Sequence, residues 1–269
     1  MPRPEGQPRS GNPGARPNRP LRTLTVVRTE RLTPAMIRVL LTGPDLDELP
    51  ELALTDHYVK LRFGDVTRTY TIRSLDRETR ELAIDFVIHG DEGLAGPWAA
   101  SAQPGDTITF AGPGGGWAPS ADADAHVLVG DESALPAIAA ALDRLKATRR
   151  DARVDVFLEV AGLAEQQELP ATAATTVTWI HRAPGDGYGE ALTRAVIDAD
   201  LPDGRIEAFV HGNADMVKPL RRHLFNERGI PRDQVSISGY WRTGMNEDGW
   251  QSSKREFNAQ MEAEQDARV

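Results

Sequence analysis

Apolar and polar residues alternate along short stretches of the chain from Leu21 to about Pro119, and Gly, Pro or Asp separates one stretch from the next. Strict alternation puts the apolar side chains of a strand on one face, so each stretch predicts a half-buried β-strand. The predicted strands read LTVVRTERL, MIRVLLTG, HYVKLRFG, TRTYTIRSLD, ELAIDFVIHG and DTITFAG. So many short strands in a segment of this length predict a small antiparallel barrel.

Beyond about Ser120 the pattern changes to strands that are mostly separated by helices. Apolar runs that are typical of buried strands read HVLVG, VDVFLEV, TVTWIHR, RIEAFVHG and QVSISGYW. Segments with apolar residues at three- and four-residue spacing, typical of amphipathic helices, read LPAIAAALDRLKATRR, GEALTRAVIDA and ADMVKPLRRHLFNERG. Strands that alternate with helices in this way predict a parallel sheet with crossover helices.

These patterns divide the chain into four parts. Residues 1–20 contain four Arg, one Glu, six Pro and three Gly, a composition that builds no core and predicts a disordered basic arm. Residues 21–119 form the predicted barrel and residues 120–245 the predicted α/β domain. Residues 246–269 are polar around Trp250 and Phe257, and we expect a terminal helix that packs on one of the domains. The predicted fold class is β plus α/β: an N-terminal antiparallel β-barrel followed by a parallel-sheet α/β domain of the nucleotide-binding type.

Composition excludes several kinds of chemistry. The chain has no Cys, which excludes disulfides, thiolate zinc sites, Cys-ligated iron–sulfur clusters and Cys nucleophiles. None of its six His lies three to five residues from another, so we expect no protein-bound metal. A redox enzyme of this composition must hold its electrons on a bound cofactor.

Charge and hydropathy bear on partners and location. The net charge of −9 and the pI of about 5.2 argue against a nucleic-acid partner. No apolar run approaches the roughly 18 residues that a membrane span needs, and the Pro-, Gly- and Arg-rich start lacks the apolar core of a secretory signal. We therefore expect a cytoplasmic monomer with no membrane contact.

A first candidate site lies on the predicted strand TRTYTIRSLD. A flavin needs a flat group against its ring, a hydroxyl or amide near its N5 atom, and a cation for its diphosphate. Tyr70, Thr71 and Arg68 offer these groups in turn, and Thr69 and Arg73 complete the candidate set. The alternative is an ordinary exposed strand, which Thr, Tyr and Arg also suit.

A second candidate site lies where the strand ELAIDFVIHG ends in glycine and leads into a short predicted helix. Free backbone N–H groups and the positive end of a helix dipole make such a turn suitable for a diphosphate. We expect Pro97 in the first helical turn with Gly96 as the cap, and His89 against the ribityl or phosphate part of a flavin. The candidates are Asp85, Val87, His89, Gly93, Ala95, Gly96 and Trp98. The alternative is a Gly-rich turn that only caps the helix.

A third candidate site is the turn after HVLVG, which reads GDESALP over residues 130–136. The first strand-to-helix turn of an open α/β sheet is where dinucleotides bind, although the G-x-G-x-x-G fingerprint is missing. The acidic pair Asp131 and Glu132 would repel a phosphate placed above it. We therefore expect this turn to face the nicotinamide, with Ser133 near the reacting ring and Ala134 as a further candidate.

Charged residues at the ends of the next two strands bear on the coenzyme. Glu159 can accept the ribose 2′-OH of NADH and repel the 2′-phosphate of NADPH. Arg182 would instead favour the phosphate. The choice between NADH and NADPH stays open.

A fourth candidate site follows the last predicted strand. Tyr240, Trp241 and Arg242 stand at its carboxyl end, between two glycines. Two aromatic side chains and a cation there are placed to wall a flavin or nicotinamide site. The alternative is a hydrophobic plug between the domains.

Taken together, these motifs resemble the siderophore-interacting protein family from about residue 21 to residue 257. This family consists of flavin-dependent ferric-siderophore reductases of the ferredoxin–NADP reductase superfamily, in which a barrel also precedes an α/β domain. The matching pieces are His57-x-Val59-Lys60-Leu61, Arg68–Arg73, Asp85-Phe86-Val87 with His89-Gly90, Gly93-x-Ala95-x-x-Trp98-Ala99, Ala111-Gly112-Pro113-Gly114-Gly115, Gly130–Pro136 and Gly239-Tyr240-Trp241-Arg242-x-Gly244. Leu94 departs from the Pro that is common in the family, and Gly96 and Pro97 are atypical too.

The resemblance implies FAD on the barrel, NADH or NADPH on the α/β domain, and a ferric siderophore that docks near the exposed flavin edge. Basic side chains attract the anionic chelate in this family. Lys60 falls on a matching position, and Arg242 is the second candidate. The implied activity is NAD(P)H-driven reduction of ferric siderophores with release of Fe(II) in the cytoplasm, and no general acid or base is expected to be essential.

Two other functions stay open from the sequence. A protein of the same fold could reduce another acceptor, such as a protein or a quinone, and a non-catalytic carrier could bind a siderophore in its barrel. Electron counting favours the flavin-dependent reductase of ferric siderophores over both, because NAD(P)H donates two electrons as hydride whereas ferric iron accepts one. A flavin connects the two.

Overall fold

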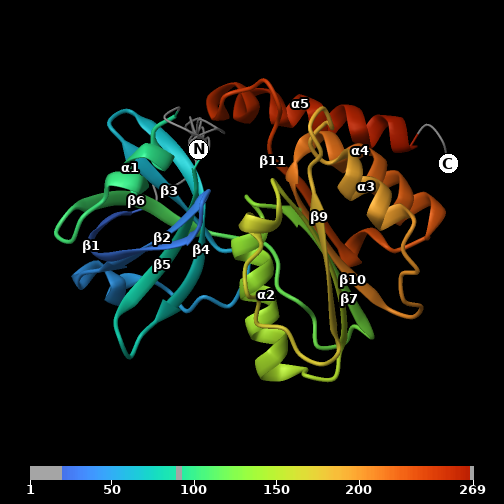
Figure 1. Cartoon of the computed structure of the whole chain (residues 1–269), viewed down its shortest axis with the longest axis horizontal. Coiled ribbons are helices and arrows are strands. Elements are labelled where there is room, and N and C mark those ends of the chain that lie inside the picture. The colour runs from blue at the N-terminus through green and yellow to red at the C-terminus, as the bar shows by residue number, and fades with distance from the viewer. Residues whose placement is uncertain (1–19, 89–92, 267–269) are drawn as a thin grey trace, which may run out of the picture.

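The N-terminal half of the molecule is the predicted barrel. The structure, a computed structural model, describes residues 20–88 and 93–266, so most of the predicted arm and His89 lie outside the described residues. Six antiparallel strands close on themselves in the order β1-β2-β5-β4-β3-β6 (Figure 1). Their bounds are β1 (Leu21–Thr33), β2 (Met36–Thr42), β3 (Tyr58–Phe63), β4 (Val66–Asp76), β5 (Glu81–Val87) and β6 (Thr107–Gly114).

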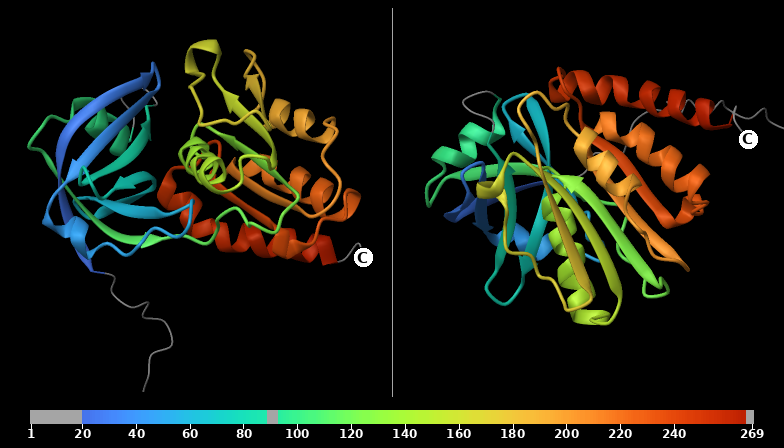
Figure 2. Two further views of the ribbon diagram at one scale, coloured as in Figure 1. Left: turned by 90° about the horizontal axis from the view of Figure 1, so that it is seen from below. Right: turned by 45° about the vertical axis from the view of Figure 1, so that its right-hand side comes forward.

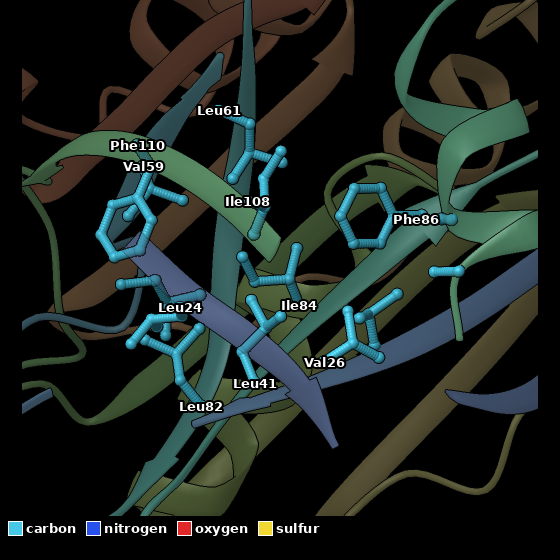
Figure 3. Packing of buried hydrophobic residues seen from close by; sticks show 14 of the residues in the cluster. Leu24, Val26, Leu41, Val59, Leu61, Leu82, Ile84, Phe86, Ile108 and Phe110 are labelled. Atoms are coloured by element: carbon cyan, nitrogen blue, oxygen red, sulfur yellow. The ribbon is translucent and has the colours of Figure 1, made fainter. Parts of the chain in front are cut away.

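Alternate residues of these strands fill the barrel. Leu24 of β1, Leu61 of β3, Ile84 of β5 and Phe110 of β6 are fully buried in one cluster (Figure 3). Burying an aliphatic or aromatic side chain contributes about 1.5–3 kcal/mol each, so this cluster holds the strands together. The side chains in between point outward and are available for other contacts.

A short helix, α1 (Ala95–Ser101), connects β5 to β6 and corrects one detail of the prediction. Its N-cap is Leu94, and Gly96 lies inside the helix rather than capping it. A Cβ atom on Gly96 would lie 3.3 Å from the backbone oxygen of Val87, so the glycine lets α1 pack closely on the end of β5. A 3-10 helix after β2, η1 (Pro44–Glu48), was not predicted.

Five parallel strands form the sheet of the second domain in the order β11-β10-β7-β8-β9, as the alternation of strands and helices predicts. Their bounds are β7 (Ala125–Asp131), β8 (Arg153–Val160), β9 (Thr175–His181), β10 (Ile206–Asn213) and β11 (Val235–Trp241). The chain runs from β7 to one side of the sheet and then returns to build the other side. In such sheets, ligands bind outside the carboxyl ends of the strands at this reversal.

Helices cover both faces of the sheet (Figure 2). α2 (Leu135–Thr148) packs on the face toward the barrel, and α3 (Glu190–Ile197) and α4 (Ala214–Arg222) pack on the other. α4 continues into one π-helical turn, η3 (His223–Glu227), and two 3-10 helices, η2 (Leu163–Glu165) and η4 (Arg232–Gln234), lie in the loops. Among the helices that the structure describes, none combines the length and apolar character needed to cross a bilayer.

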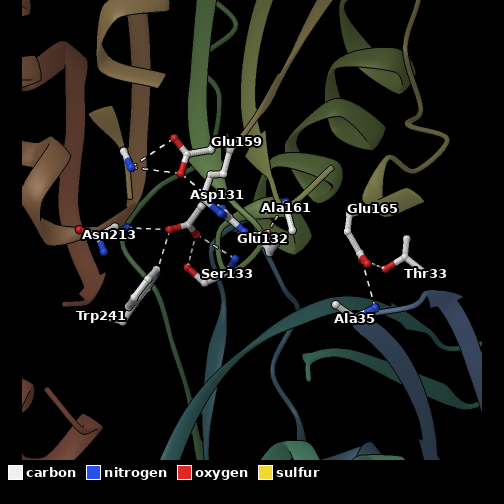
Figure 4. Close-up of polar contacts among 12 residues, drawn as sticks. Thr33, Ala35, Asp131, Glu132, Ser133, Glu159, Ala161, Glu165, Asn213 and Trp241 are labelled. Carbon is white, nitrogen blue, oxygen red and sulfur yellow. Dashed lines mark hydrogen bonds and ion pairs between the residues drawn. The ribbon is translucent and has the colours of Figure 1, made fainter. Parts of the chain in front are cut away.

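Polar side chains join the two domains at separate places. Asp143 of α2 forms an ion pair with Arg73 of β4 at 2.7 Å. Glu165 of η2 accepts hydrogen bonds from the hydroxyl of Thr33 at 2.5 Å and from the backbone N–H of Ala35 at 3.1 Å (Figure 4). These contacts hold the barrel against α2 and against the loop between β8 and β9.

The terminal helix, α5 (Glu247–Asp266), contacts both domains, whereas the sequence predicted packing on one of them. Glu247 accepts the backbone N–H of Thr69 on β4 at 2.9 Å. Trp250 is 1% exposed and packs beside β11, where a Cβ atom on Gly239 would lie 2.8 Å from its ring. Gly239 therefore leaves the space that both Ala214 of α4 and Trp250 of α5 occupy, and α5 lies across the junction of the two domains (Figure 1).

Candidate functional site

A cavity of about 510 Å³ lies between the two domains. Its walls come from β3, β4 and β5 of the barrel, the turn after β7, the ends of β10 and β11, and α5. It therefore lies where the strand order of the sheet reverses, which is the place where an open α/β sheet binds its ligands.

An aromatic stack forms the barrel wall of this cavity. The ring of Tyr70 packs on Phe86 with 4.5 Å between centroids, and Trp98 of α1 packs behind Phe86 at 5.6 Å. Burial raises the pKa of Tyr70 above its ordinary value, so its hydroxyl stays neutral. Trp98 supports the wall from behind and does not line the cavity.

Two charged groups flank the aromatic stack in different states. Asp85 of β5 pairs with Arg38 of β2 through both of its oxygens, at 2.7 and 2.8 Å. Lys60 of β3 lines the cavity and has no hydrogen-bond or ion-pair partner within residues 20–88 and 93–266. The charge of Asp85 is therefore neutralised by Arg38 on the outer face of the barrel, whereas the ammonium of Lys60 is available to an anion.

Arg68, the predicted cation for a diphosphate, is turned toward α5. Its guanidinium lies 3.7 Å from Glu247 and 3.5 Å from Asp248, and it does not line the cavity. Burial raises the pKa of Glu247, which also accepts the backbone N–H of Thr69 at 2.9 Å. The donors that the sequence predicted for a diphosphate at this edge of the barrel thus contact carboxylates in the first turn of α5.

One buried carboxylate, Asp131, organises the turn after β7. It accepts hydrogen bonds from the N–H and the hydroxyl of Ser133, from the N–H of Asn213 and from the indole N–H of Trp241 (Figure 4). Burial raises the pKa of Asp131, and the neighbouring Glu132 acts in the same direction. Asp131 therefore ties together the ends of β7, β10 and β11, and the hydroxyl of Ser133 is committed to it.

A second polar cluster lies at the ends of β8 and β9. Arg182 forms ion pairs with Glu132 and, at 3.3 Å, with Glu159, and its guanidinium lies 4.6 Å from the centroid of the Tyr188 ring. Both oxygens of Glu159 accept the N–H of Gly189, at 3.1 and 3.2 Å. Glu159 and Arg182 are therefore bound to each other, and neither lines the cavity.

His211, at the end of β10, presents a neutral imidazole beside the cavity. Its ring stacks on Phe209 at a centroid distance of 4.0 Å and lies 4.9 Å from the ring of Tyr240. Its Nε2 atom shares a hydrogen bond of 2.9 Å with the hydroxyl of Ser236. Burial lowers the pKa of His211 to about 3, and the charge of Lys254 on α5 lowers it further. The ring therefore carries no charge at neutral pH.

The residues that follow β11 separate into two groups. Tyr240 and Trp241 line the cavity, and the edge of the Trp241 ring meets Tyr188 with 4.9 Å between centroids. Arg242 instead pairs with Asp215 at 3.0 Å and lies over the ring of Phe257 at 5.2 Å. It is engaged outside the cavity lining.

Many of the residues predicted from the sequence meet around this cavity. Those that line it are Lys60, Thr69, Tyr70, Thr71, Asp85, Val87, Asp131, Ser133, Tyr240 and Trp241. The other described candidates lie outside the lining, namely Arg68, Arg73, Gly93, Ala95, Gly96, Trp98, Ala134, Glu159, Arg182 and Arg242.

Sequence reasoning missed most of the α5 side of the cavity and part of its other walls. The missed lining residues include Tyr58, Tyr188, His211, Met245, Glu247, Trp250 and Lys254. Tyr58 carried a signal, because it stands two residues before Lys60 on one strand and so shares its face. The α5 residues carried little signal in the sequence, because their position over the cavity depends on tertiary contacts that sequence spacing does not report.

The chemistry of the lining residues suits FAD. The barrel wall offers the ring of Tyr70, the hydroxyl of Thr71 and the ammonium of Lys60, and the opposite wall offers the rings of Tyr240 and Trp241. Flat aromatic faces with a few polar groups are what a flavin ring needs for binding and orientation.

Two family models match the chain, one for each domain. The model described as "Siderophore-interacting FAD-binding domain" matches residues 25–66 and 64–117, which form the barrel. The model described as "Siderophore-interacting protein" matches residues 123–244, which form the α/β domain.

Relatives and solved structures show the same similarity over nearly the whole chain. The chain is 32% identical to ferric vibriobactin reductase ViuB of Vibrio cholerae, covering 87% of this chain and 93% of that protein. It is 30% identical to the NADPH-dependent ferric-chelate reductase of Escherichia coli, covering 82% and 92%. A siderophore utilization protein from T. fusca matches with a TM-score of 0.74 and 38% identity, covering 85% and 95%.

Proposed function

Because the chain belongs to the siderophore-interacting protein family, we propose that it is an FAD-dependent reductase of ferric siderophores, driven by NADH or NADPH. The observation that carries the proposal is the cavity, which places Tyr70 and Thr71 of the barrel opposite the strand ends where an open α/β sheet binds a dinucleotide. FAD bound there accepts electrons in pairs and passes them on singly, as ferric iron requires.

We assign the barrel wall to the flavin. Tyr70 supplies a flat face that Phe86 holds in place, and Thr71 supplies a hydroxyl at the same wall. Arg68 and Thr69, at the edge of β4, would bind the diphosphate together with backbone N–H groups near Gly93 and Ala95. Their present bonds to Glu247 and Asp248 would then be shared with, or replaced by, the phosphate oxygens.

The sheet wall has a different task in this proposal. Asp131 orients Ser133 and Trp241 through hydrogen bonds, so the nicotinamide half of the coenzyme would meet a fixed surface. Tyr240 and Trp241 line that side of the cavity, and their rings would exclude water from the bound nicotinamide. Electron transfer to a ferric chelate requires no general acid or base, and the proposal assigns none.

Lys60 is proposed to attract the chelate. The chain has a net charge of −9, so an anionic ferric siderophore is repelled at long range and needs a local cation at the opening. Lys60 lines the cavity, whereas Arg242 is paired with Asp215. The monomeric state and the release of Fe(II) in the cytoplasm are parts of the proposal that stay predictions.

The decisive experiment measures both halves of the reaction on the purified protein. FAD binding is followed by its visible absorbance, and the loaded protein is reduced anaerobically with NADH or NADPH. It is then mixed in a stopped-flow instrument with ferric chelates, a ferredoxin or a quinone. We expect fast reoxidation by the chelates. A protein that binds no flavin would be a carrier at most, and one that reduces only the ferredoxin or the quinone would serve another acceptor.

A further inference from the structure

The carboxyl ends of β8 and β9 bear on which nicotinamide coenzyme the protein takes. This inference rests on the proposed function and concerns its coenzyme. With the nicotinamide directed at the barrel and at the turn after β7, the adenosine half lies over the ends of β8 and β9, where the carboxylate of Glu132 reaches Ala161 and Arg182. NADPH carries a phosphate on the ribose of that half, where NADH carries a hydroxyl. A phosphate there needs a cation, whereas a hydroxyl can donate to a carboxylate.

Charge at this end of the sheet is dominated by carboxylates. Arg182 faces Glu132 and Glu159, and its side chain is 14% exposed. The ring of Tyr188 covers one face of its guanidinium. Two carboxylates therefore face one cation, so the cluster carries a net negative charge and repels a phosphate even though it contains an arginine.

Glu132 is the acidic member of the Arg182 cluster that reaches the cavity. It lines the cavity, its side chain is 12% exposed, and its Oε1 atom accepts the backbone N–H of Ala161 at 3.1 Å. Glu159, which the sequence suggested for the ribose contact, is 1% exposed and turned away toward Gly189. The carboxylate available to a coenzyme ribose is therefore that of Glu132.

We propose that Glu132 makes this protein select NADH over NADPH. Its carboxylate holds Arg182 away from the coenzyme and itself meets the ribose, where it accepts a 2′-hydroxyl and repels a 2′-phosphate. Glu132 and Arg182 thus act as one unit. Glu132 determines the coenzyme specificity, and its ion pair with Arg182 keeps that guanidinium from contacting a 2′-phosphate.

Nucleotide fragments test this proposal without involving flavin or iron. The probes are ADP and 2′,5′-ADP, titrated calorimetrically into the FAD-loaded protein. The unsubstituted protein should bind ADP more tightly. Glu132→Gln keeps an acceptor for the Ala161 N–H but removes the charge, and it should raise the affinity for 2′,5′-ADP about tenfold while leaving that for ADP within about twofold.

The gain of 2′,5′-ADP affinity in Glu132→Gln could come from the release of Arg182 or only from the loss of a negative charge. Two further variants distinguish these causes. Arg182→Gln should leave the affinity for ADP within about twofold and lower that for 2′,5′-ADP, because the two carboxylates lose the cation paired with them. In Glu132→Gln/Arg182→Gln most of the gain should disappear, since the released cation is gone. Equal binding of the two ligands by the unsubstituted protein, or a full gain of 2′,5′-ADP affinity in the double variant, would overturn the proposal. Thermal unfolding of each variant checks that it is folded.

Failure of this inference and failure of the proposed function give different results. If chelates are reduced and the nucleotide preference does not respond to Glu132→Gln, the function stands and the role of Glu132 is wrong. If the preference switches as expected in a protein that reduces no chelate, the role of Glu132 stands and the acceptor is wrong.

Discussion

The two walls of the cavity are built in opposite ways. On the barrel wall, Tyr70 is packed from behind by Phe86, and Lys60 keeps its charge unpaired within the described residues. On the sheet wall, Asp131 accepts hydrogen bonds from three other residues, and Glu132 pairs with Arg182. The barrel wall thus presents an aromatic face and an unpaired charge to a ligand. The polar atoms of the sheet wall instead form hydrogen bonds and ion pairs within their own domain.

This difference shows that a charged residue beside a cavity can have one of two roles, in structure or in ligand binding. A buried group such as Asp131, whose hydrogen bonds are all made within the protein, contributes to the shape of the wall, and its removal costs stability. A group without partners contributes to binding, and its removal costs affinity. Substitutions on the two walls should therefore fail in different assays.

The largest effect is expected on the sheet wall. Asp131→Ala should lower the free energy of unfolding by about 3 kcal/mol, because it leaves the buried donors of Asn213 and Trp241 without an acceptor. Urea unfolding at neutral pH measures this. Asp122→Ala, at an exposed position of the same domain, is the matched control and should change stability by less than about 0.5 kcal/mol. A loss below about 1 kcal/mol for Asp131→Ala would mean that this wall is not held by its carboxylate.

The next effect concerns the barrel wall. Tyr70→Ala should weaken FAD binding about a hundredfold, because it removes the flat support while leaving the core residue Phe86 in place. Tyr70→Phe keeps the ring and should bind FAD within about threefold of the unsubstituted protein. Fluorescence titration of FAD into the flavin-free protein gives both values. Retention of full affinity in Tyr70→Ala would remove this residue from the site.

The pH dependence of stability sharpens the comparison further. His211 has a pKa of about 3 in the folded protein and an ordinary value of 6.5, so below pH 6.5 the unfolded chain binds a proton that the folded chain does not. The free energy of unfolding should fall as pH falls through this window, by about 2 kcal/mol between pH 7 and pH 5 from His211 alone.

Substitution isolates this contribution. His211→Phe should flatten the fall measured by urea unfolding between pH 7 and pH 5. His126, whose pKa burial lowers to about 4, contributes in the same direction down to that pH, so His126→Phe should flatten the curve as well. An unchanged slope in His211→Phe would show that its ring is not kept neutral by burial.

The smallest effect is expected at Lys60. Lys60→Ala should raise the KM for an anionic ferric chelate about fivefold and that for a neutral chelate by less than about twofold, because a charge without a partner in the described residues acts mainly on attraction. Steady-state reduction of paired chelates measures the difference. Arg62→Ala, on the same face of β3 but outside the cavity lining, serves as the control. Equal effects on both chelates would count against docking at Lys60.

The sequence predicted the elements far better than the contacts between them. Alternation along β3 and β4 is a local signal, so the barrel and the position of Tyr70 followed from it. The pairing of Arg182 with Glu132 joins residues 50 positions apart, and no spacing rule reports it. The sequence gives the charge of each residue but does not report its ion-pair partner. For this reason Arg182 and Glu159 were expected to contact the coenzyme directly.

Two further differences have the same origin. The cap of α1 is Leu94, which offers no side-chain hydrogen bond, so the usual signs of a helix start pointed to Gly96 instead. Arg68 was expected to be free for a diphosphate, and its ion pairs with Glu247 and Asp248 depend on a helix that begins about 180 residues later in the chain.

The placement of α5 separates the integrity of the two domains from the integrity of the cavity between them. The core clusters of the barrel and of the sheet contain none of the described residues of α5, whereas Glu247 and Trp250 of α5 line the cavity. Damage confined to α5 would therefore yield a protein with two sound domains and an open binding site.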